Sequence, residues 1–508
     1  MEPVNAIELR GVTKRFGEVV ANDNVNLTVK KGEILSILGE NGSGKTTLMN
    51  MLSGIYFPDE GEILVGGKVV TIRSPKDSFA LGIGMIHQHF KLINILTAAE
   101  NIILGLPGKG RLNRKQVEDE IAELTDRYGF DLNPGQKIYD MSVSQKQTVE
   151  ILKVLYRGAD ILILDEPTAV LTPQETEKLF AVLRNMRAAG KSIIIITHKL
   201  NEVLALSDRV AVLRKGRYID TVQTADATVE SLTEMMVGEK IRLDINRTEP
   251  EGAQKRIEMR GITCRNKEGL KVLKEASFTA YSGEILGVAG ISGSGQKELL
   301  ESVAGLQLIE SGEILYYPPE GETKKISEMR AEDIKKLGIT LSFVPEDRLG
   351  MGLVGSMDLT DNMMIRSYKD GSGFFADRKA PKKLAQEIVD QLEVATPGVG
   401  TPVSRLSGGN VQKILVGREI AGNPTVLMVA YPVRGLDINS SYTIYNLLNA
   451  QKEKGVAVIC VGEDLDVLLA LCDKILVLAG GKVAGVVDAR STTKEKLGWM
   501  MTGAGEER

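Results

Sequence analysis

The sequence predicts an α/β protein made of two tandem domains, each built around a mostly parallel β-sheet. The segment Val29–Ile55 recurs as Ala280–Leu306, with Gly39 matching Gly290 at an offset of 251 residues. Each copy alternates short β-branched runs, such as "GEILSIL", "DILILD", "SIIIIT" and "DRVAVL", with polar helical stretches. A repeat of this size is a whole domain rather than a solenoid unit.

Composition limits the classes of protein to consider. The 508 residues are enough for two or three domains with sizeable cores. The net charge is −4 with acids and bases interspersed, which gives no general attraction for nucleic acid. The three cysteines lack metal spacing, which suits a reducing compartment. Met1–Arg10 lacks the apolar region of a secretory signal, and the apolar runs are far shorter than the roughly 20 residues of a spanning helix, so we expect membrane association only through partners.

The repeat also sets the domain boundaries. From "MSVSQ" (Met141–Gln145) and "LSGGN" (Leu406–Asn410) onward the two copies match at an offset of 265 residues, so the second copy carries 14 extra residues upstream. The polar segment Asp244–Gln254 predicts a linker at 244–254 between domains 1–243 and 255–508. Amphipathic segments with little strand character over Thr97–Gln147 predict a helical subdomain in the first copy.

"GENGSGKT" (Gly39–Thr46) fits the phosphate-loop pattern G-x-x-x-x-G-K-[ST], between an apolar strand and a helix. Glycines let backbone N–H groups wrap phosphates, and the helix N-terminus adds positive potential. Lys45 is expected to contact the β- and γ-phosphates, and the Thr46 hydroxyl to ligate Mg²⁺. The predicted nucleotide-binding residues of this loop are Gly39, Glu40, Asn41, Gly42, Ser43, Gly44, Lys45, Thr46 and Thr47.

Two carboxylates end the apolar strand "ILILDEP" at the edge where parallel sheets bind ligands. Asp165 is expected to hold Mg²⁺, and Glu166 to polarise the attacking water. His198 closes the strand "SIIIITH" and is expected to contact the γ-phosphate, with a purely structural histidine as the alternative. Phe16 is expected either to stack on adenine or to pack in a core. Gln88 lies between His87 and His89, whose spacing leaves a metal pair as a weaker alternative.

The phosphate loop, Gln88, "DEP", His198 and the sequence "LSGGN" occur in an order that resembles the ATP-binding-cassette (ABC) superfamily over essentially the whole chain. The resemblance implies RecA-like sheets, an antiparallel β subdomain and a helical subdomain in each domain. It implies ATP and Mg²⁺ as cofactors, with Gln88 contributing to metal binding and catalysis beside Lys45, Glu166 and His198. "MIHQHFKLI" and "FVPEDRLGMGL" are most similar to the nucleoside branch of the simple-sugar and nucleoside uptake group.

A member of that group is expected to work at the cytoplasmic face of the membrane. The implied partners are integral membrane permease subunits and, through them, an extracellular substrate-binding protein or lipoprotein. The segments Phe90–Leu104 and Asp347–Ile365 are apolar but not strand-like, and we expect them to dock membrane-subunit helices, unless they are ordinary core helices. A charge at Leu92 or Ile95 should then uncouple transport.

The second copy departs from the first at each position of this chemistry. The replacements are Lys45 by Gln296, Thr46 by Lys297, Asp165 by Ala430, Glu166 by Tyr431, His198 by Glu463, Gln88 by Glu346 and Phe16 by Lys267. The signature sequences show the opposite distribution: the first copy has the altered "MSVSQ", and the second copy keeps the intact "LSGGN". Family members bind ATP between two domains packed head to tail, so the resemblance predicts one competent site that joins the first phosphate loop to Ser407, Gly408, Gly409 and Asn410.

Other classes of function compete with this interpretation. A ribose- or galactose-type sugar importer is the alternative within the same group. A soluble tandem cassette protein such as a translation factor usually has two competent sites and a long basic linker. A DNA-repair cassette ATPase would show a coiled coil or zinc insertion, and neither heptads nor cysteine clusters occur in the sequence.

Overall fold

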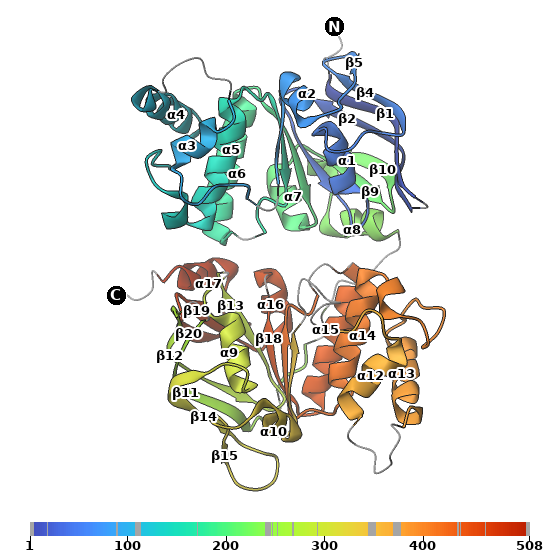
Figure 1. Cartoon of the computed structure of the whole chain (residues 1–508), viewed down its shortest axis with the longest axis vertical. Coiled ribbons are helices and arrows are strands. Elements are labelled where there is room, and N and C mark those ends of the chain that lie inside the picture. Colours follow the sequence, from blue (N-terminus) through green and yellow to red (C-terminus); the bar gives the residue numbers. More distant parts are fainter. Residues whose placement is uncertain are drawn as a thin grey trace. The chain divides into compact units, whose positions relative to one another are not determined.

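The structure is a computed structural model that describes residues 5–17, 19–87, 90–106, 113–169, 171–238, 245, 247–250, 252–266, 269–291, 293–343, 352–368, 377–433, 436, 438–462 and 464–503. The chain divides into two compact units, Met1–Ile241 and Arg242–Arg508. Both units contain a four-stranded and a six-stranded sheet, with helices beside them (Figure 1). The α/β fold class and the tandem arrangement are therefore confirmed.

The first unit contains ten strands among its described residues. They are β1 (Asn5–Phe16), β2 (Val19–Lys30), β3 (Ile34–Leu38), β4 (Glu60–Val65), β5 (Lys68–Val70), β6 (Ile83–Ile86), β7 (Ile161–Asp165), β8 (Ser192–Thr197), β9 (Arg209–Arg214) and β10 (Arg217–Gln223). The antiparallel sheet has the order β2-β1-β4-β5, and the central sheet has the order β10-β9-β3-β8-β7-β6. In the central sheet only β10 pairs antiparallel.

The central strands are apolar throughout because both faces of their sheet are covered. Leu35 and Ile37 of β3 pack in one core cluster with the antiparallel sheet and helix α1 (Lys45–Leu52). Ile34 of the same strand packs on the other face, in a cluster with the helical part of the unit. All six residues of β8 are buried. Parallel strands covered on both faces have this uninterrupted apolar pattern.

Besides α1, the helices of the first unit are α2 (Pro75–Ala80), α3 (Ala98–Ile103), α4 (Arg114–Tyr128), α5 (Val143–Tyr156), α6 (Pro173–Ala188), α7 (Leu200–Leu206) and α8 (Val229–Val237). Helices α3, α4, α5 and α6 lie on the side of the central sheet away from the antiparallel sheet, whereas α1 and α2 lie beside the antiparallel sheet (Figure 1). α3, α4 and α5 contact one another and form the predicted helical subdomain. Its last helix runs nine residues beyond the predicted end at Gln147, because α5 stays apolar on its buried face as far as Tyr156.

The second unit repeats this arrangement. Its strands are β11 (Lys255–Arg265), β12 (Lys271–Tyr281), β13 (Ile285–Gly290), β14 (Ile309–Tyr316), β15 (Lys324–Lys325), β16 (Ile339–Phe343), β17 (Val426–Ala430), β18 (Ala457–Val461), β19 (Lys474–Ala479) and β20 (Lys482–Asp488). Its helices are α9 (Gln296–Val303), α10 (Ala331–Lys336), α12 (Leu359–Ser367), α13 (Lys379–Gln391), α14 (Gly408–Ile420), α15 (Ile438–Glu453), α16 (Leu465–Leu471) and α17 (Lys494–Met501). The sheet orders are β12-β11-β14-β15 and β16-β17-β18-β13-β19-β20.

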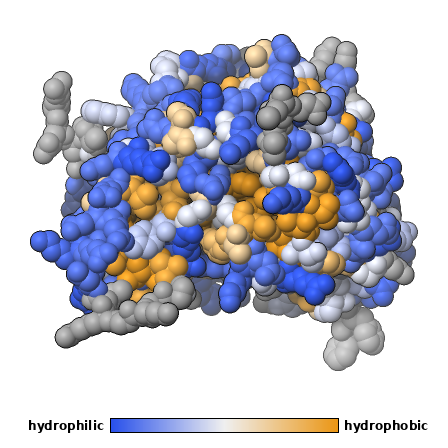
Figure 2. Space-filling model, turned by 90° about the horizontal axis from the view of Figure 1, so that it is seen from above, coloured by the Kyte–Doolittle hydropathy of each residue, from blue (hydrophilic) through white to orange (hydrophobic). Residues whose placement is uncertain are grey.

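Among the described residues, no helix is both long enough and apolar enough to cross a bilayer. On the face drawn in Figure 2, apolar side chains gather in separate patches between hydrophilic ones. Exposed large apolar residues include Ile95, Tyr139, Tyr368 and Trp499. A large contiguous apolar patch marks a candidate contact surface on a folded protein, whereas single exposed apolar residues are common.

Candidate functional site

The phosphate loop follows β3, and helix α1 begins at its end. Gly44 caps α1 with φ 94°, and a Cβ atom there would lie 2.4 Å from the Ala21 carbonyl oxygen. A Cβ on Gly39 would lie 2.3 Å from the Leu213 carbonyl oxygen. Both positions therefore require glycine, one for its backbone conformation and both for space. Asn41, Gly42 and Thr46 are exposed along this loop, whereas Ser43 is buried and its hydroxyl is without a described partner.

The Lys45 ammonium lies inside the loop that it is predicted to serve. Its Nζ atom donates to the carbonyl oxygens of Gly39 at 2.7 Å and Glu40 at 2.8 Å. Burial lowers the pKa of Lys45, and the carboxylates of Glu166 and Asp165 act in the opposite direction. A buried ammonium group that donates to carbonyl oxygens of the loop is well placed to bind an anion there, so the residue fits the predicted phosphate contact.

Asp165 and Thr46 bring two oxygen donors together from β7 and α1. The Thr46 hydroxyl hydrogen-bonds to the Asp165 carboxylate. Burial, reinforced by the negative charge of Glu166, raises the pKa of Asp165 to about 6. A carboxylate beside a hydroxyl provides the hard oxygen ligands that Mg²⁺ prefers. These two residues therefore fit the predicted metal ligands.

Glu166 and His198 form the other half of the site. Glu166 Oε1 lies 2.9 Å from His198 Nδ1, which joins the ends of β7 and β8. The backbone of Glu166 is left-handed, with φ 46°, and its N–H donates to the Ile196 carbonyl oxygen at 2.9 Å. Burial opposes ionisation of Glu166, but the hydrogen bond and charge of His198, with Lys45 and Lys199, hold its pKa below the usual value. A strained, ionised carboxylate at a strand end is typical of functional sites.

The two remaining predicted site residues of the first domain are Phe16 and Gln88. Phe16 at the end of β1 is 43% exposed, and its ring contacts Tyr56 edge-on at 5.1 Å between centroids. Lys14 Nζ lies 5.5 Å from the same ring. An aromatic ring this exposed is available for stacking and is not a core residue, so the core alternative for Phe16 is wrong. Gln88 and the neighbouring His89 lie outside the described residues.

The second unit keeps the backbone of the site without its chemistry. Gly293 and Gly295 have positive φ angles of 86° and 101°. The equivalent Gly42 and Gly44 of the first loop also have positive φ angles. Gln296 replaces the lysine, and its amide donates to the Ile291 carbonyl oxygen at 3.0 Å. The remaining replacements among the described residues are Lys297, which pairs with Glu301, and Ala430 and Tyr431, which have no carboxylate. Lys267, Glu346 and Glu463 lie outside the described residues.

The two signature segments begin helices α5 and α14 with different caps. In the first unit Ser142 and Gln145 form a closed capping box, with side-chain to backbone bonds of 3.0 and 3.2 Å. In the second unit the Asn410 amide donates to Ser407 Oγ at 2.9 Å, and Asn410 Oδ1 accepts from the Ala395 N–H at 3.1 Å. Ser407 and Gly408 are exposed. Ser407 Oγ also accepts from the Asn410 N–H at 3.4 Å, so α14 has a serine cap but lacks the reciprocal side-chain bond that completes the capping box of α5.

Comparison with known proteins agrees with this geometry. A family model described as "ABC transporter" matches residues 22–169 and 273–432. The chain belongs to the ABC transporter family. This ABC protein is 43% identical to the nucleoside import ATP-binding protein NupA of Lactococcus lactis, with 98% of each chain covered. It is 41% identical to the guanosine import ATP-binding protein NupO of Bacillus subtilis, covering 98% of this chain and 97% of that one.

Sugar importers are also similar to this ABC protein. The ribose import ATP-binding protein RbsA 1 of Rubrobacter xylanophilus is 37% identical, with 98% of each chain covered. The predicted membership of the simple-sugar and nucleoside group is confirmed by these relatives. Their order favours the nucleoside interpretation over the sugar alternative.

Sequence reasoning missed three polar residues in the segments that follow Glu166 and His198. Thr168, Lys199 and Glu202 interact with one another, and none of them matches a phosphate-site pattern. A signal was available in the repeat, because the residues 265 positions later are Val433, Asp464 and Val467. Comparing the two copies at every polar position around the site would have identified them.

Proposed function

We propose that this chain is the ATP-hydrolysing, energy-coupling subunit of a nucleoside importer, with a single competent ATP site. The observation that carries the proposal is the convergence of Lys45, the Thr46–Asp165 pair and the Glu166–His198 pair in the first unit. The equivalent described positions of the second unit hold no carboxylate. Phosphoryl transfer depends on positioning and charge stabilisation, which only the first group of residues supplies.

Each residue of the first unit has a distinct part in this chemistry. Lys45 holds the β- and γ-phosphates, and the backbone N–H groups at the start of α1 surround them. Mg²⁺ bound to Thr46 and Asp165 would neutralise phosphate charge. Glu166 orients and polarises the water that attacks, while His198 keeps Glu166 in place and donates to the γ-phosphate. Phe16 offers its exposed ring to adenine.

The competent site is completed by the signature of the second domain. The intact phosphate loop lies in the first domain and the glycine-containing signature in the second, whereas the degraded loop and the closed MSVSQ cap are the other pair. A head-to-tail arrangement with one selected site accounts for this division, because each nucleotide then uses one loop and the opposite signature. Ser407, Gly408, Gly409 and Asn410 are the residues proposed to approach the γ-phosphate bound at Lys45.

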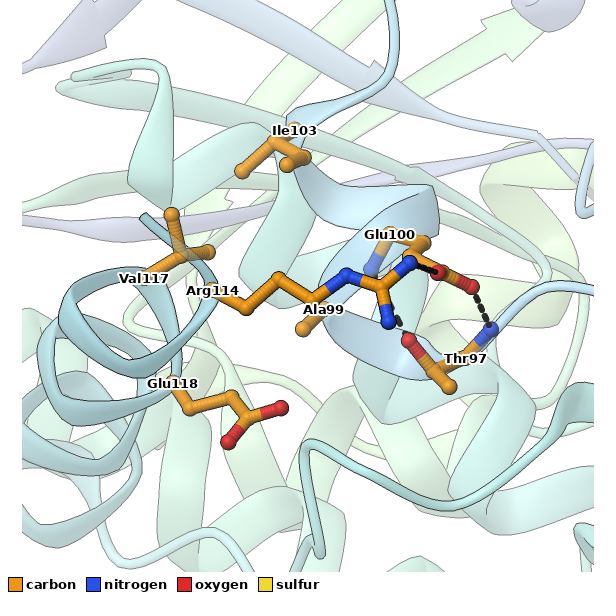
Figure 3. Close-up of a pocket in the computed structure, with 7 residues that line it drawn as sticks. All are labelled: Thr97, Ala99, Glu100, Ile103, Arg114, Val117 and Glu118. Carbon is orange, nitrogen blue, oxygen red and sulfur yellow. Dashed lines mark hydrogen bonds and ion pairs between the residues drawn. The ribbon is translucent and has the colours of Figure 1, made fainter. Parts of the chain in front are cut away.

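We assign the docking of the membrane subunits to the segment Phe90–Leu104, which follows Gln88 in the first domain. Ile95 is 72% exposed and Leu104 47% exposed, while the Asn101 amide ties this segment down through Ile93 and Thr97. A small pocket beside it lies between α3 and α4, where Ala99, Ile103 and Val117 face one another (Figure 3).

An ion pair borders this pocket. Arg114 reaches Glu100 at 3.0 Å, and Glu100 in turn accepts from the Thr97 N–H at 2.8 Å (Figure 3). An apolar pocket with a paired charge on its rim suits a short helix with one apolar anchor. We therefore assign a cytoplasmic helix of a permease subunit to this surface. Leu92, in contrast, packs against the core of the helical subdomain, so a charge there would also disturb the fold.

The second domain presents a corresponding surface. Asn362 holds Val354 and Asp358 by the same set of amide bonds that Asn101 makes in the first domain. Val354, Met357 and Tyr368 are 39%, 40% and 57% exposed. The two domains thus carry similar surfaces. This fits an importer with two different permease subunits or with two copies of the same permease subunit. The chain is then a peripheral protein on the cytoplasmic face of the membrane, and an extracellular binding protein delivers the cargo.

Transport measurements in cells test the proposal. A strain that lacks this chain should lose uptake of radiolabelled guanosine, and the native chain should restore it while Glu166→Gln should not. Uptake of radiolabelled ribose is measured in the same strains to test the sugar alternative. Uptake of ribose but not guanosine would replace the nucleoside assignment with the sugar alternative. If the purified chain turned over ATP but neither uptake depended on it, the importer function itself would be refuted.

A further inference from the structure

Three side chains join the loop after Glu166 to the turn after His198. The Thr168 hydroxyl donates to Glu202 Oε2 at 2.5 Å, and Glu202 Oε1 lies 3.1 Å from Lys199 Nζ. The Lys199 ammonium also donates to the Thr168 carbonyl oxygen at 3.3 Å. Thr168, Lys199 and Glu202 are together termed the clamp. Its three interactions form a closed ring between the segments that follow Glu166 and His198 in the sequence.

Two of the three clamp residues are largely buried, and the Lys199 side chain is 30% exposed. Thr168 is 3% exposed, and the Glu202 side chain is 16% exposed. Both line a small cavity together with Ser36 and Phe180. A carboxylate in such surroundings is unfavourable unless its oxygens are paired. Here each oxygen of Glu202 has its own partner, so the charge is held in one place by two bonds.

The start of the loop makes the same backbone contacts in both domains, with the clamp or without it. In the second domain the corresponding residue Tyr431 donates its N–H to the Val461 carbonyl oxygen, as Glu166 does to Ile196 in the first. The Gln412 amide bonds to the Pro432 carbonyl oxygen, as Gln147 bonds to Pro167. These contacts are present in both domains, so they do not depend on the clamp.

The clamp, in contrast, is missing from the second domain. Val433 and Val467 stand at the positions of Thr168 and Glu202, and neither has a polar group. Asp464 stands at the position of Lys199, with the opposite charge. The clamp is therefore present where the carboxylate chemistry is present and absent where that chemistry is absent.

The N-cap of α7 in the first domain, Lys199, is less favourable for its helix than the equivalent N-cap in the second domain, Asp464. Lys199 is the N-cap residue of α7 and makes no side-chain cap. Asp464 caps α16 in the second domain by accepting from the Asp466 N–H at 2.9 Å. Aspartate is among the favoured N-cap residues, and lysine is not. A residue that is worse for its own helix at this position points to a role outside the helix.

We infer that the clamp is a positioning device for ATP turnover, in which Glu202 holds Thr168 and Lys199 and thereby fixes Glu166 against His198. This inference rests on the proposed ATPase function and adds a specific set of supporting residues to it. Glu202 acts through its two partners and is a positioning residue rather than a catalytic one. Displacement of a reacting group by about 1 Å can cost a large factor in rate, so loosening the loop should lower kcat.

Steady-state ATP hydrolysis by the full-length chain tests the clamp. Thr168→Val removes the hydroxyl at nearly constant shape and copies the second domain, whereas Thr168→Ser keeps it. We expect Thr168→Val to lower kcat about tenfold with KM for ATP unchanged, and Thr168→Ser to stay within about twofold of the native chain. Glu202→Gln should lower kcat similarly, and the double variant should be no worse than either single one, because they remove the same bond. Val433→Thr, at the matching position of the second domain, is the control and should change nothing.

The outcomes separate the clamp from simpler explanations. Equal losses in Thr168→Ser and Thr168→Val, or in Thr168→Val and Val433→Thr, would overturn the inference. So would a fall in melting temperature that parallels the fall in kcat across the variants, because that result assigns the clamp to stability alone. If the native chain hydrolyses ATP and the clamp variants match it, only the clamp fails. If the native chain does not hydrolyse ATP, the proposed function fails instead.

Discussion

Glu166 in the first domain and Tyr431 in the second occupy the same left-handed backbone conformation, with φ 46° and 54°. Each donates its N–H to the neighbouring strand at 2.9 Å, to Ile196 in one domain and to Val461 in the other. Such a conformation is unfavourable for residues other than glycine. The second domain therefore keeps the strained backbone conformation of this turn, although its residue there, Tyr431, carries no carboxylate.

This pair of residues gives the first prediction. Glu166→Gln should lower ATP turnover by about 100-fold or more, because the water loses its polarising carboxylate, while nucleotide binding is retained. Tyr431→Phe should leave turnover within about twofold of the native rate, because this position supplies no acid–base group. Turnover measured by phosphate release and binding measured by calorimetry check both. Comparable losses from the two changes would contradict a single competent site.

The pKa of Asp165 gives the second prediction, for the metal- and nucleotide-free protein. Its folded-state pKa of about 6 lies above the usual 3.8, so the folded state favours the protonated acid. The resulting contribution to stability is present below pH 4 and is lost as the pH rises through 6. Asp165→Asn should therefore raise the free energy of unfolding at pH 7.5 by about 2 kcal/mol, with no gain at pH 4. ATP turnover should be lost at both pH values. A variant less stable than the native protein at pH 7.5 would show that Asp165 supports the fold.

Local patterns explain how much of the structure could be predicted. The apolar strands β3, β7, β8 and β9 were predictable because they are buried on both faces, and the phosphate loop because its glycines are spaced by its backbone. The polar strand β2 carries no such pattern, and the antiparallel sheet was expected only from the family resemblance. Pairs that meet across the sheet, such as Glu166 with His198, lie 32 residues apart, and only the folded sheet brings them together. The clamp matches no local pattern, and its only signal in the sequence is the difference between the two copies at Thr168, Lys199 and Glu202.

The docking surface gives the third prediction. Ile95→Asp should reduce import by at least about tenfold, because a charge at a central contact of an interface commonly costs about 2 kcal/mol or more. ATP binding and the melting temperature should be unchanged, since Ile95 is 72% exposed. Val69→Asp on β5, at 61% exposure, is the matched control and should import normally. Normal import by Ile95→Asp, or an equal loss in the control, would remove the permease from this surface.

The linker gives the last prediction, because its described part is anchored to the second domain. Lys452 Nζ pairs with Asp473 at 2.7 Å and donates to the Thr248 carbonyl oxygen at 2.5 Å, with side-chain exposures of 1% and 5% for the ion pair. The equivalent pair in the first domain, Arg187 with Asp208, is 43% and 33% exposed. The same ion pair is thus on the surface in one domain and buried in the other, where the linker lies against it.

Lys452→Met should therefore leave a buried carboxylate unpaired and lower the stability of the second domain by about 3–5 kcal/mol. Trp499, the single tryptophan of the chain, lies on α17 and reports this domain in a urea titration. Lys383→Met, which breaks an exposed pair in the same domain, should cost at most about 1 kcal/mol. Proteolysis of Lys452→Met should also cut the chain near Thr248 faster than in the native protein. A loss no larger than that of the control would mean that the linker lies on the second domain without being held by this pair.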